Sequence, residues 1–408
     1  MKYVVVGASA AGISCAKTLR ELDKGCEITL ISKDKHVVSR CMIHHYIKGI
    51  RTIETLSFAP YDFFEVYNIK WIKGIEVTGI NTKEHKLNLS NGDEVDYDRV
   101  CLSTGASAFI PPIENLREAN NVVGLRDLED AMKIKEEVQK VKDVVVLGGG
   151  LVGIDAIAGM MDYDVKIHLV EMGDRILPLQ LDYYASDAYH TRLKNAGVDL
   201  KLGVKAEKLN LDENNNPKSL LISTGEEIPC ELVIVATGVR SNVGFLKDTG
   251  VECDKFGLII NEKGETNIKD IYGAGDITGR NPIWPTAVKE GIIAANNMLG
   301  TELFMTDFFG SKNTMHLCGL ATMSLGVVIK PDDTYEEEIE IQNEDYKKII
   351  HKDGKIYGAI IQGDLSYGGI LTQLIKEKIN VSRVKKPLYD IDYADFFNIK
   401  ENLEYVLI

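Results

Sequence analysis

Two glycine-rich segments of the same pattern are the parts of this sequence with the clearest chemistry. Residues 7–12 read Gly-Ala-Ser-Ala-Ala-Gly, and residues 148–153 read Gly-Gly-Gly-Leu-Val-Gly. Each directly follows an apolar run of the length of a buried strand, residues 3–6 and 144–147. A strand that turns sharply on glycine into a helix presents free N–H groups and the positive end of the helix dipole to a pyrophosphate. One such match is weak support, but two in this context predict two nucleotide sites in one chain.

An acidic residue is expected after the second strand of each nucleotide-binding unit. In the second unit, an apolar run ends in Glu171. A carboxylate there accepts hydrogen bonds from both ribose hydroxyls and repels a 2′-phosphate, so it favours NADH over NADPH. In the first unit, the run 27–31 ends in Ser32, Lys33 and Asp34. Two alternatives stay open there: Asp34 reaches the adenosine ribose from two positions further on, or Ser32 makes a weaker contact.

The elements that must position these residues occur twice along the chain. After the first glycine segment come a strand-like run, a hairpin, and a strand that ends in Thr104 and Gly105. After the second come a similar run, a turn-rich hairpin, and a strand that ends in Thr237 and Gly238. Two nucleotide-binding lobes of common design account for this internal repeat.

These elements predict an α/β fold with two Rossmann-like lobes and a small α+β domain at the C-terminus. The first lobe resumes after the second, so residues 1–113 and 242–308 are expected to form one domain and residues 114–241 the other. The third domain is expected over residues 309–408. A chain of 408 residues is long enough for three domains with cores of their own.

The expected C-terminal domain has a different pattern from the two lobes. Strand-like runs at residues 325–329 and 357–361 surround a charged stretch, and residues 370–378 have the apolar spacing of a helix. The tail, residues 390–408, is acidic and aromatic, and its role stays open.

The overall composition is that of an ordinary globular chain, with 45% hydrophobic and 26% charged residues. The formal net charge of −14 argues against nucleic acid and anionic membrane surfaces as partners. No apolar run approaches the length of a membrane span. Because the N-terminus leads straight into a strand without a basic and apolar leader, we expect a cytoplasmic protein.

Seven cysteines are scattered along the chain without a Cys-x-x-Cys pair. This pattern argues against a disulfide scaffold, a zinc site or another metal site, and a paired dithiol centre. Cys101 and Cys230 lie in or beside apolar strand segments and are expected to be small buried hydrophobic residues. Cys41 differs, because it lies in a polar segment directly after Arg40 and one helical turn before His44.

With these motifs the chain resembles the flavin-dependent pyridine nucleotide–disulfide oxidoreductase superfamily. It is most similar to the single-cysteine branch, which contains coenzyme A disulfide reductases, NADH oxidases and NADH:rubredoxin reductases. The most specific marker is the segment 266–276, which ends in Tyr-Gly-Ala-Gly-Asp. The resemblance covers residues 1–310 and, more loosely, the C-terminal domain, where residues 363–369 are similar to rubredoxin-reductase-like proteins. It implies FAD in the first lobe, NADH in the second, and a homodimer.

The resemblance also implies roles for individual residues. Asp276, at the end of the marker segment, hydrogen-bonds the ribityl chain of FAD in this family. A helix that starts at Pro285 points its N-terminus at the flavin pyrimidine edge, where its dipole stabilises the reduced flavin anion. Asp155 takes the place of a family glutamate near the junction of nicotinamide and flavin. The cofactor-binding residues expected from the motifs and the resemblance are Gly7, Ser9, Ala10, Ala11, Gly12, Ser32, Lys33, Asp34, Arg40, Thr104, Gly105, Gly148, Gly150, Leu151, Val152, Gly153, Glu171, Gly238, Gly275, Asp276, Pro285, Thr286 and Ala287.

In the coenzyme A disulfide reductases and NADH oxidases that this chain resembles, a lone redox cysteine beside the flavin occupies the place of Cys41, whereas in rubredoxin reductases that position is usually not cysteine. The thiolate of the redox cysteine attacks a disulfide, persulfide or peroxide and returns electrons taken from the flavin. Arg40 and His44 are expected to hold the thiolate. The family's Leu-Pro-Tyr after the cysteine is replaced by Ile-His-His-Tyr at residues 43–46, and an unreactive packing thiol is the alternative. The catalytic residues of this hypothesis are Cys41, His44 and Asp155.

Three functions agree with these residues. The first is an NADH-dependent, coenzyme A disulfide reductase-like enzyme that reduces a small disulfide or persulfide through Cys41. The second is an NADH:rubredoxin-type reductase or an NADH oxidase, with Cys41 as a bystander. The third is a non-catalytic flavin-binding sensor. An acidic chain can dock an acidic carrier protein only through a local basic patch, for which Arg383, Lys385 and Lys386 are candidates, and this mildly disfavours the second function.

Overall fold

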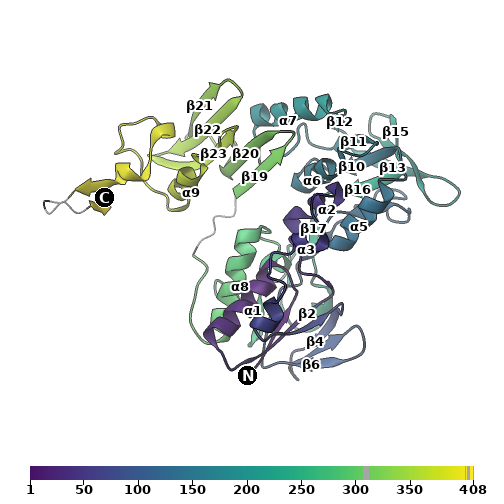
Figure 1. Ribbon diagram of the computed structural model, residues 1–408, viewed down its shortest axis with the longest axis vertical. Coiled ribbons are helices and arrows are strands. Elements are labelled where there is room, and N and C mark those ends of the chain that lie inside the picture. Colours follow the sequence, from purple (N-terminus) through teal and green to yellow (C-terminus); the bar gives the residue numbers. More distant parts are fainter. Residues whose placement is uncertain (307–311, 400, 402–404, 408) are drawn as a thin grey trace. The chain divides into compact units, whose positions relative to one another are not determined.

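The computed structural model describes residues 1–306, 312–399, 401 and 405–407 (Figure 1). The expected domain boundary between residues 308 and 309 therefore lies outside the described residues. The chain divides into two compact units. The first unit contains Met1–Gly148, Val152–Ile167 and the described residues from 206 to 306, and the second contains Gly149–Leu151, His168–Lys205 and the described residues from 312 onward.

A parallel sheet in the first unit has the strand order β18-β7-β1-β2-β3. Its strands are β1 (Lys2–Val6), β2 (Glu27–Ser32), β3 (Lys70–Lys73), β7 (Arg99–Leu102) and β18 (Ile271–Gly273). Tyr3 and Val5 pack into the core on one face, and Val4 and Val6 pack into a separate core on the other. The strand is a continuous apolar run because both of its faces are buried.

Helices α1 (Ala10–Leu22) and α8 (Trp284–Met298) lie side by side on the face of this sheet that carries Tyr3 and Val5 (Figure 1). Their close approach requires glycine at position 291, because a Cβ there would collide with the carbonyl oxygen of Ala11. The other short helices of this part of the first unit are α2 (His44–Lys48), α3 (Ile53–Leu56), α4 (Phe63–Val66) and the 3-10 helices η1 (Arg40–Met42), η2 (Gly244–Leu246) and η3 (Gly275–Thr278).

The internal repeat of the sequence has a structural counterpart. In the first unit, β10 (Asp143–Leu147) and β16 (Leu232–Val235) pair in parallel, and β16 pairs with β9 (Val122–Gly124). In the second unit, residues 168–171 of β11 (Lys166–Glu171) pair in parallel with β12 (Asp199–Leu202). The expected hairpins are three-stranded antiparallel sheets: β4 (Val77–Asn81), β5 (Lys86–Leu89) and β6 (Glu94–Asp96), then β13 (Ala206–Leu211), β14 (Pro217–Ile222) and β15 (Glu227–Pro229).

The remaining elements of this region are two further helices and a short two-stranded sheet. The helices are α5 (Leu128–Glu137) and α6 (Leu151–Met160), and the strands are β8 (Ala106–Ala108) and β17 (Val239–Ser241). The predicted α/β fold with Rossmann-like parallel sheets is therefore confirmed. Among the described residues, no helix has both the length and the apolar character needed to cross a bilayer.

The C-terminal part of the second unit is an antiparallel sheet with one helix on it. The strand order is β19-β20-β23-β22-β21, with β19 (Lys312–Leu317), β20 (Leu320–Gly326), β21 (Glu336–Gln342), β22 (Asp345–Lys352), β23 (Lys355–Gln362) and helix α9 (Gly368–Lys376). The strand expected at residues 325–329 was misplaced, because β20 already ends at Gly326. That residue has a φ of +60°, and it lies against the carbonyl of Tyr357 so closely that a side chain would not fit.

The tail contains the 3-10 helices η4 (Leu388–Asp390) and η5 (Tyr393–Phe396) and a strand pair, β24 (Phe397–Ile399) with β25 (Tyr405–Leu407). Residues 400, 402–404 and 408 of the expected acidic tail lie outside the described residues.

The two faces of the C-terminal sheet are of opposite character. One face forms an apolar core with α9, through residues such as Ile349, Ile361 and Leu374. The other face is buried but polar, and it packs on α7 (Tyr183–Asn195) of the same unit. The polar side chains buried on that face are Thr322, Ser324, Tyr346, Lys348 and Gln362.

A buried carboxylate at the N-cap of α7 connects the helix to this polar face. Asp182 accepts the backbone N–H of Ala185 through Oδ1 at 3.0 Å, and its Oδ2 accepts the hydroxyl of Tyr346 at 2.6 Å. The Lys348 Nζ lies 3.1 Å from the same Oδ2 and 2.9 Å from Glu337 Oε1. The lysine is only 6% exposed, so its charge depends on these two carboxylates.

We expect Asp182→Ala to lower the free energy of unfolding of this part of the chain by about 3 kcal/mol, because it leaves Lys348 and Tyr346 buried without their main partner. Hydrogen exchange of the β22 amides in increasing urea measures this loss. Glu344→Gln is the matched control, since it breaks an exposed ion pair with Arg192 and should cost less than about 1 kcal/mol. If the two changes lowered the free energy of unfolding equally, Asp182 would not be the main buried partner of Lys348 and Tyr346.

Candidate active site

A cavity of about 500 Å³ lies in the first unit, at the carboxyl ends of the parallel strands. This is where ligands of doubly wound α/β folds bind. It brings together most of the residues that the sequence predicted for the first nucleotide. The predicted residues that line it are Gly7, Ser9, Ala10, Ala11, Ser32, Lys33, Asp34, Arg40, Cys41, Thr104, Gly105, Gly275, Asp276 and Ala287.

The turn between β1 and α1 is shaped by close backbone approach. Gly7 has a φ of +116°, and a Cβ there would collide with the carbonyl oxygen of Ser103. A Cβ at Gly12 would collide with the carbonyl oxygen of Gly7, so the first turn of α1 lies directly against the strand end. Ser9, Ala10 and Ala11 line the cavity, whereas Gly12 does not and instead packs against the turn. The N-terminus of α1 thereby faces the cavity, as a pyrophosphate site requires.

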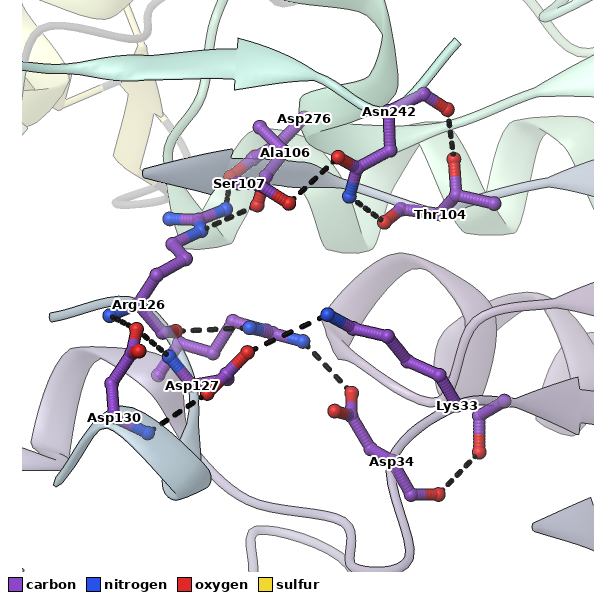
Figure 2. Close-up of polar contacts among 12 residues, drawn as sticks. Lys33, Asp34, Thr104, Ala106, Ser107, Arg126, Asp127, Asp130, Asn242 and Asp276 are labelled. Carbon is purple, nitrogen blue, oxygen red and sulfur yellow. Dashed lines mark hydrogen bonds and ion pairs between the residues drawn. The ribbon is translucent and has the colours of Figure 1, made fainter. Parts of the chain in front are cut away.

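Asp276 lies at the cavity in η3, and its carboxylate is paired with Arg126 (Figure 2). Arg126 also donates through Nε to the carbonyl of Ala106 at 3.0 Å, and its backbone N–H binds the Asp130 carboxylate at 2.8 Å. Sequence reasoning missed Arg126. A usable signal exists, because Asp127 and Asp130 form a capping box at the start of α5, directly after this arginine.

Arg40 has partners other than the expected thiolate. Its Nη2 donates to Asp34 Oδ2 at 2.8 Å, and its Nη1 donates to the carbonyl of Arg126 at 2.9 Å. Arg40 therefore connects the loop after β2 to the segment before α5. The expectation that Arg40 stabilises a Cys41 thiolate is corrected by this pairing.

The end of β2 favours one of the two alternatives for the adenosine ribose. The Ser32 hydroxyl donates to the carbonyl of Asp34 at 2.8 Å and accepts the indole N–H of Trp71 at 2.9 Å. Ser32 is 4% exposed, so it serves mainly to hold the loop. The carboxylate of Asp34 lines the cavity, as does Lys33, whose Nζ lies 3.5 Å from Asp127 Oδ2.

Thr104 and Gly105 are held against the cavity by Asn242, a residue that sequence reasoning did not single out. The Asn242 side chain donates to the Thr104 carbonyl at 3.0 Å, and the Thr104 hydroxyl donates to the Asn242 carbonyl at 2.9 Å (Figure 2). Ser107 donates to the Asn242 amide oxygen at 2.8 Å. Gly105 has a φ of +70° with open space beside its Cα, which suits close approach of a ligand.

The start of α8 also lies at the cavity, as the sequence predicted. Ala287 lines it together with Trp284, while Pro285 sits in the first turn of α8, where its missing N–H costs nothing. Thr286 is buried and, like Pro285, belongs to the helix start without lining the cavity. Glu290, missed from the sequence, accepts the Gly275 N–H at 2.6 Å, and burial raises its pKa to about 7.

Cys41 opens into the cavity, where its side chain is exposed. Surrounding protein nevertheless desolvates the thiol and raises its pKa; Asp155 raises it further, and Arg126 lowers it. His44 is neutral near pH 7, because burial lowers its pKa to about 4. The expected stabilisation of a thiolate by His44 is therefore also corrected: a neutral imidazole supplies no positive charge.

Asp155, in α6, lies beside His44 rather than beside an arginine or lysine. The His44 Nδ1 is 3.6 Å from Asp155 Oδ2. Although 43% of the Asp155 side-chain surface is accessible, desolvation by surrounding protein raises its pKa to about 7. Of the three residues named as catalytic, His44 and Asp155 are neighbours, and Cys41 lines the cavity, which His44 and Asp155 do not.

The second glycine turn repeats the geometry of the first. A Cβ at Gly148 would lie 2.5 Å from the carbonyl oxygen of Ala236, and one at Gly153 would collide with the carbonyl oxygen of Gly148. In the second unit, the Glu171 carboxylate accepts the N–H of Gly149 at 2.5 Å and the N–H of Gly173 at 2.6 Å. The carboxylate therefore lies directly at the glycine turn. Gly150 and Gly238 have open space beside them, and Leu151 and Val152 form the first turn of α6.

These features fit two dinucleotides. In each case a parallel strand ends in a turn whose first and last glycines leave no room for a Cβ, and a helix N-terminus follows. The first turn opens into a cavity within the range of nucleotide and cofactor sites. The fold and the site together define an oxidoreductase with two dinucleotide sites as the class of protein.

Comparison with known proteins specifies the family. Residues 1–291 match the model of the pyridine nucleotide-disulphide oxidoreductases, and residues 312–379 match that of the rubredoxin NAD+ reductase C-terminal domain. The chain belongs to the pyridine nucleotide-disulphide oxidoreductase family. It is an NAD(P)H oxidoreductase, and its cofactors are FAD and NADH.

Three similar proteins differ in the acceptor that their names give. An NADH oxidase of Methanocaldococcus jannaschii is 31% identical over 74% of this chain and 71% of its own length. An NAD(P)H coenzyme A polysulfide/persulfide reductase of Pyrococcus horikoshii is 29% identical over 77% and 73%. The crystal structure of the NADH:rubredoxin oxidoreductase of Clostridium acetobutylicum superimposes with a TM-score of 0.76 at 26% identity, over 94% of this chain and 97% of that one. These three proteins therefore share the family and differ in the acceptor.

We expect Asp276→Ala to weaken FAD binding by about tenfold to a hundredfold, the effect of losing a charge-assisted hydrogen bond of about 1.5–3 kcal/mol. Flavin retention after dilution and gel filtration measures this. Asp254→Ala is the matched control, because it removes a similar pairing with Arg280 away from the cavity. Glu171→Ala should retain FAD as the wild type does, and equal loss of FAD in the Asp276 and Glu171 variants would refute the assignment of the two sites.

Proposed function

We propose that this chain oxidises NADH through FAD and reduces a small disulfide or persulfide through Cys41. The observation that carries the proposal is the position of this thiol. All seven cysteines lie within the described residues, and Cys41 is the one that lines the cavity. Cys253 is also exposed but lies away from the cavity, and Cys101 and Cys230 are fully buried.

The same proposal assigns the two cofactors to the two lobes. FAD is bound by the lobe formed by residues 1–113 and 242–308, NADH by residues 114–241, and residues 309–408 form the C-terminal domain. In support, the residues that line the cavity come from the first lobe, except for Arg126. The carboxylate of Glu171 at the second glycine turn supports a nicotinamide dinucleotide without a 2′-phosphate.

FAD bound in the cavity would supply the redox chemistry, namely acceptance of a hydride from NADH and onward transfer of two electrons. The chain's part is to hold both nucleotides at their glycine turns and to present the Cys41 sulfur to the acceptor. The thiolate of Cys41 attacks one sulfur of the acceptor, and a mixed disulfide forms as the other sulfur leaves. Two electrons that originate from NADH then reduce the mixed disulfide, which releases the second thiol and restores Cys41.

A small redox protein is the second candidate acceptor. The match of residues 312–379 to the rubredoxin NAD+ reductase C-terminal domain and the similarity to a rubredoxin oxidoreductase favour it. The basic patch that such docking needs is weak. Arg383 and Lys385 are exposed, but Lys386 is paired with Asp395 at 2.7 Å and with Asp392 at 3.4 Å. An acidic carrier would therefore meet few uncompensated positive charges.

We expect NADH to reduce the flavin at least about tenfold faster than NADPH at equal low concentrations, a factor that corresponds to about 1.4 kcal/mol. The physical reason is repulsion between Glu171 and the 2′-phosphate. Anaerobic stopped-flow measurement of flavin bleaching tests this. Glu171→Gln should bring the rates of flavin reduction by NADH and NADPH closer together. A wild-type preference for NADPH would contradict this prediction and would indicate that a basic residue such as Arg175 outweighs the carboxylate.

We expect Cys41→Ser to leave FAD content and flavin reduction by NADH unchanged and to abolish turnover with bis(2-hydroxyethyl) disulfide, because serine cannot form the mixed disulfide. Steady-state oxidation of NADH under anaerobic conditions measures the turnover. Cys253→Ser, which removes an exposed thiol away from the cavity, is the control and should behave as the wild type. If Cys41→Ser still reduces the disulfide, the role of Cys41 is refuted, and a small redox protein becomes the favoured acceptor.

A further inference from the structure

The loop between β11 and α7, residues 172–181, binds the second glycine turn directly. The Leu177 N–H donates to the carbonyl of Gly149 at 2.8 Å, and Glu171, at the end of β11, accepts the N–H of the same glycine. Both backbone polar groups of Gly149 are therefore held by residues 171–177. A Cβ at Gly149 would lie 3.2 Å from the Glu171 side chain, so the strand end also packs closely against the turn. The orientation of the turn thus depends on the position of this loop.

Leu177 makes its contact from an unfavourable backbone conformation. Its φ is +51°, in the left-handed region that leucine rarely adopts, and its side chain is fully buried. Such a conformation persists only where surrounding contacts determine it, and it is found mainly at functional sites. The loop therefore needs support from a neighbouring element.

Helix α7 gives that support at Ile176, the residue before Leu177. The Ser186 hydroxyl donates to the carbonyl of Ile176 at 2.9 Å, and the N–H of Ile176 donates to His190 Nε2 at 3.3 Å. Burial lowers the pKa of His190, so its imidazole is neutral near pH 7 and can accept this bond. Both backbone polar groups of Ile176 are thus bonded by α7.

The C-terminal sheet in turn holds α7. In β23, the Gln362 side chain donates to the carbonyl of Ala185, next to Ser186, at 2.9 Å. Tyr189 of α7 donates its hydroxyl to Thr322 Oγ1 in β20 at 2.8 Å. The side chains of Gln362, Tyr189 and Thr322 are all buried. Separating the sheet from the helix would break these bonds together, so the position of α7 depends on the sheet.

A continuous series of hydrogen bonds therefore leads from the C-terminal sheet to the second glycine turn, through α7 and the loop. Every segment in this series belongs to the second unit. We propose that the C-terminal sheet positions this turn for NADH, and that Gln362 and Ser186 are positioning residues. The affinity for NADH then depends on the docking of the sheet on α7. This inference rests on the proposed function, which assigns NADH to this turn.

Gln362→Leu tests the sheet end of the series. Leucine fills much of the volume of glutamine, and the Ala185 carbonyl keeps the acceptor role that it has within the helix, so the fold is retained. We expect the dissociation constant for NADH to rise about fivefold to tenfold, while FAD content and the rate of flavin reduction at saturating NADH stay as in the wild type. Anaerobic stopped-flow measurement of flavin reduction across NADH concentrations gives both the constant and the limiting rate. A change in the constant alone separates positioning of the turn from general damage to the fold.

Ser186→Ala breaks the same series at its loop end and should raise the dissociation constant by a similar factor. In the double variant, NADH should bind no more weakly than in the weaker-binding single variant, because both changes interrupt one series. Ser324→Ala is the matched control. The Ser324 hydroxyl is buried on the same face of the sheet, but it has no hydrogen-bond partner among the described residues. Its removal should leave the affinity for NADH unchanged.

The coupling is reciprocal, which provides a second measurement. If the docked sheet favours nucleotide binding, the bound nucleotide must favour the docked sheet by the same factor. NAD⁺ is the probe, because it leaves the flavin oxidised. In the FAD-loaded wild type, saturating NAD⁺ should slow hydrogen exchange of the β23 amides by at least about fivefold. In Ser186→Ala, saturating NAD⁺ should leave their exchange unchanged.

Three results of the variant experiments would overturn the proposal. They are wild-type affinity for NADH in Gln362→Leu and Ser186→Ala, additive effects in the double variant, and an equal loss of affinity in Ser324→Ala. If a variant does not retain FAD, exchange in the wild type decides, and β23 amides that NAD⁺ does not protect would contradict the proposal. The proposed function fails separately if Glu171→Ala binds NADH as the wild type does, because NADH would then not bind at this turn.

Discussion

The cofactor cavity depends on the close approach of three backbone segments. β1 ends at Val6, α1 begins at Ala10, and α8 packs on α1 where Gly291 faces the carbonyl of Ala11. A side chain at Gly12 or Gly291 would collide with a carbonyl oxygen and move a helix away from the sheet. Because the first turn of α1 supplies the N–H groups that face the cavity, such a movement would also displace the groups that receive a pyrophosphate.

Hard steric constraints of this kind are the part of the molecule that sequence predicts well. The glycine turns, the continuous apolar strands and the paired hairpins each depend on a few neighbouring residues, so their patterns identified both lobes and the residues around the first cavity. The end of β20 could not be predicted in the same way. It depends on the approach of Gly326 to Tyr357, and no local pattern in residues 325–329 reports a contact with a residue that far along the chain.

Charge pairing was the part that sequence did not predict. Arg40 is next to Cys41 in the chain, which suggested an electrostatic partner for the thiol. Its guanidinium instead reaches Asp34 and the carbonyl of Arg126, a residue 86 positions away. Arg126 was not predicted from the sequence, and its pairing with Asp276 and its place in the cavity lining show that it belongs to the site. Adjacency in sequence does not determine the direction of a long side chain, whereas the fold does.

The same pairing changes the chemistry expected of Cys41. An uncompensated cation beside a cysteine lowers the pKa of the thiol, so the residue is present as the reactive thiolate. Here Arg40 and Arg126 are each engaged with a carboxylate, the neighbouring imidazole is neutral, and desolvation favours the thiol. Attack by such a thiol requires a group that takes its proton during the reaction. Asp155 lies beside His44, four residues before the close docking of α6 on α2 at Gly159, and desolvation raises its pKa to about 7. The packing of α2 on α6 thus brings a carboxylate beside the imidazole that follows the thiol in the chain.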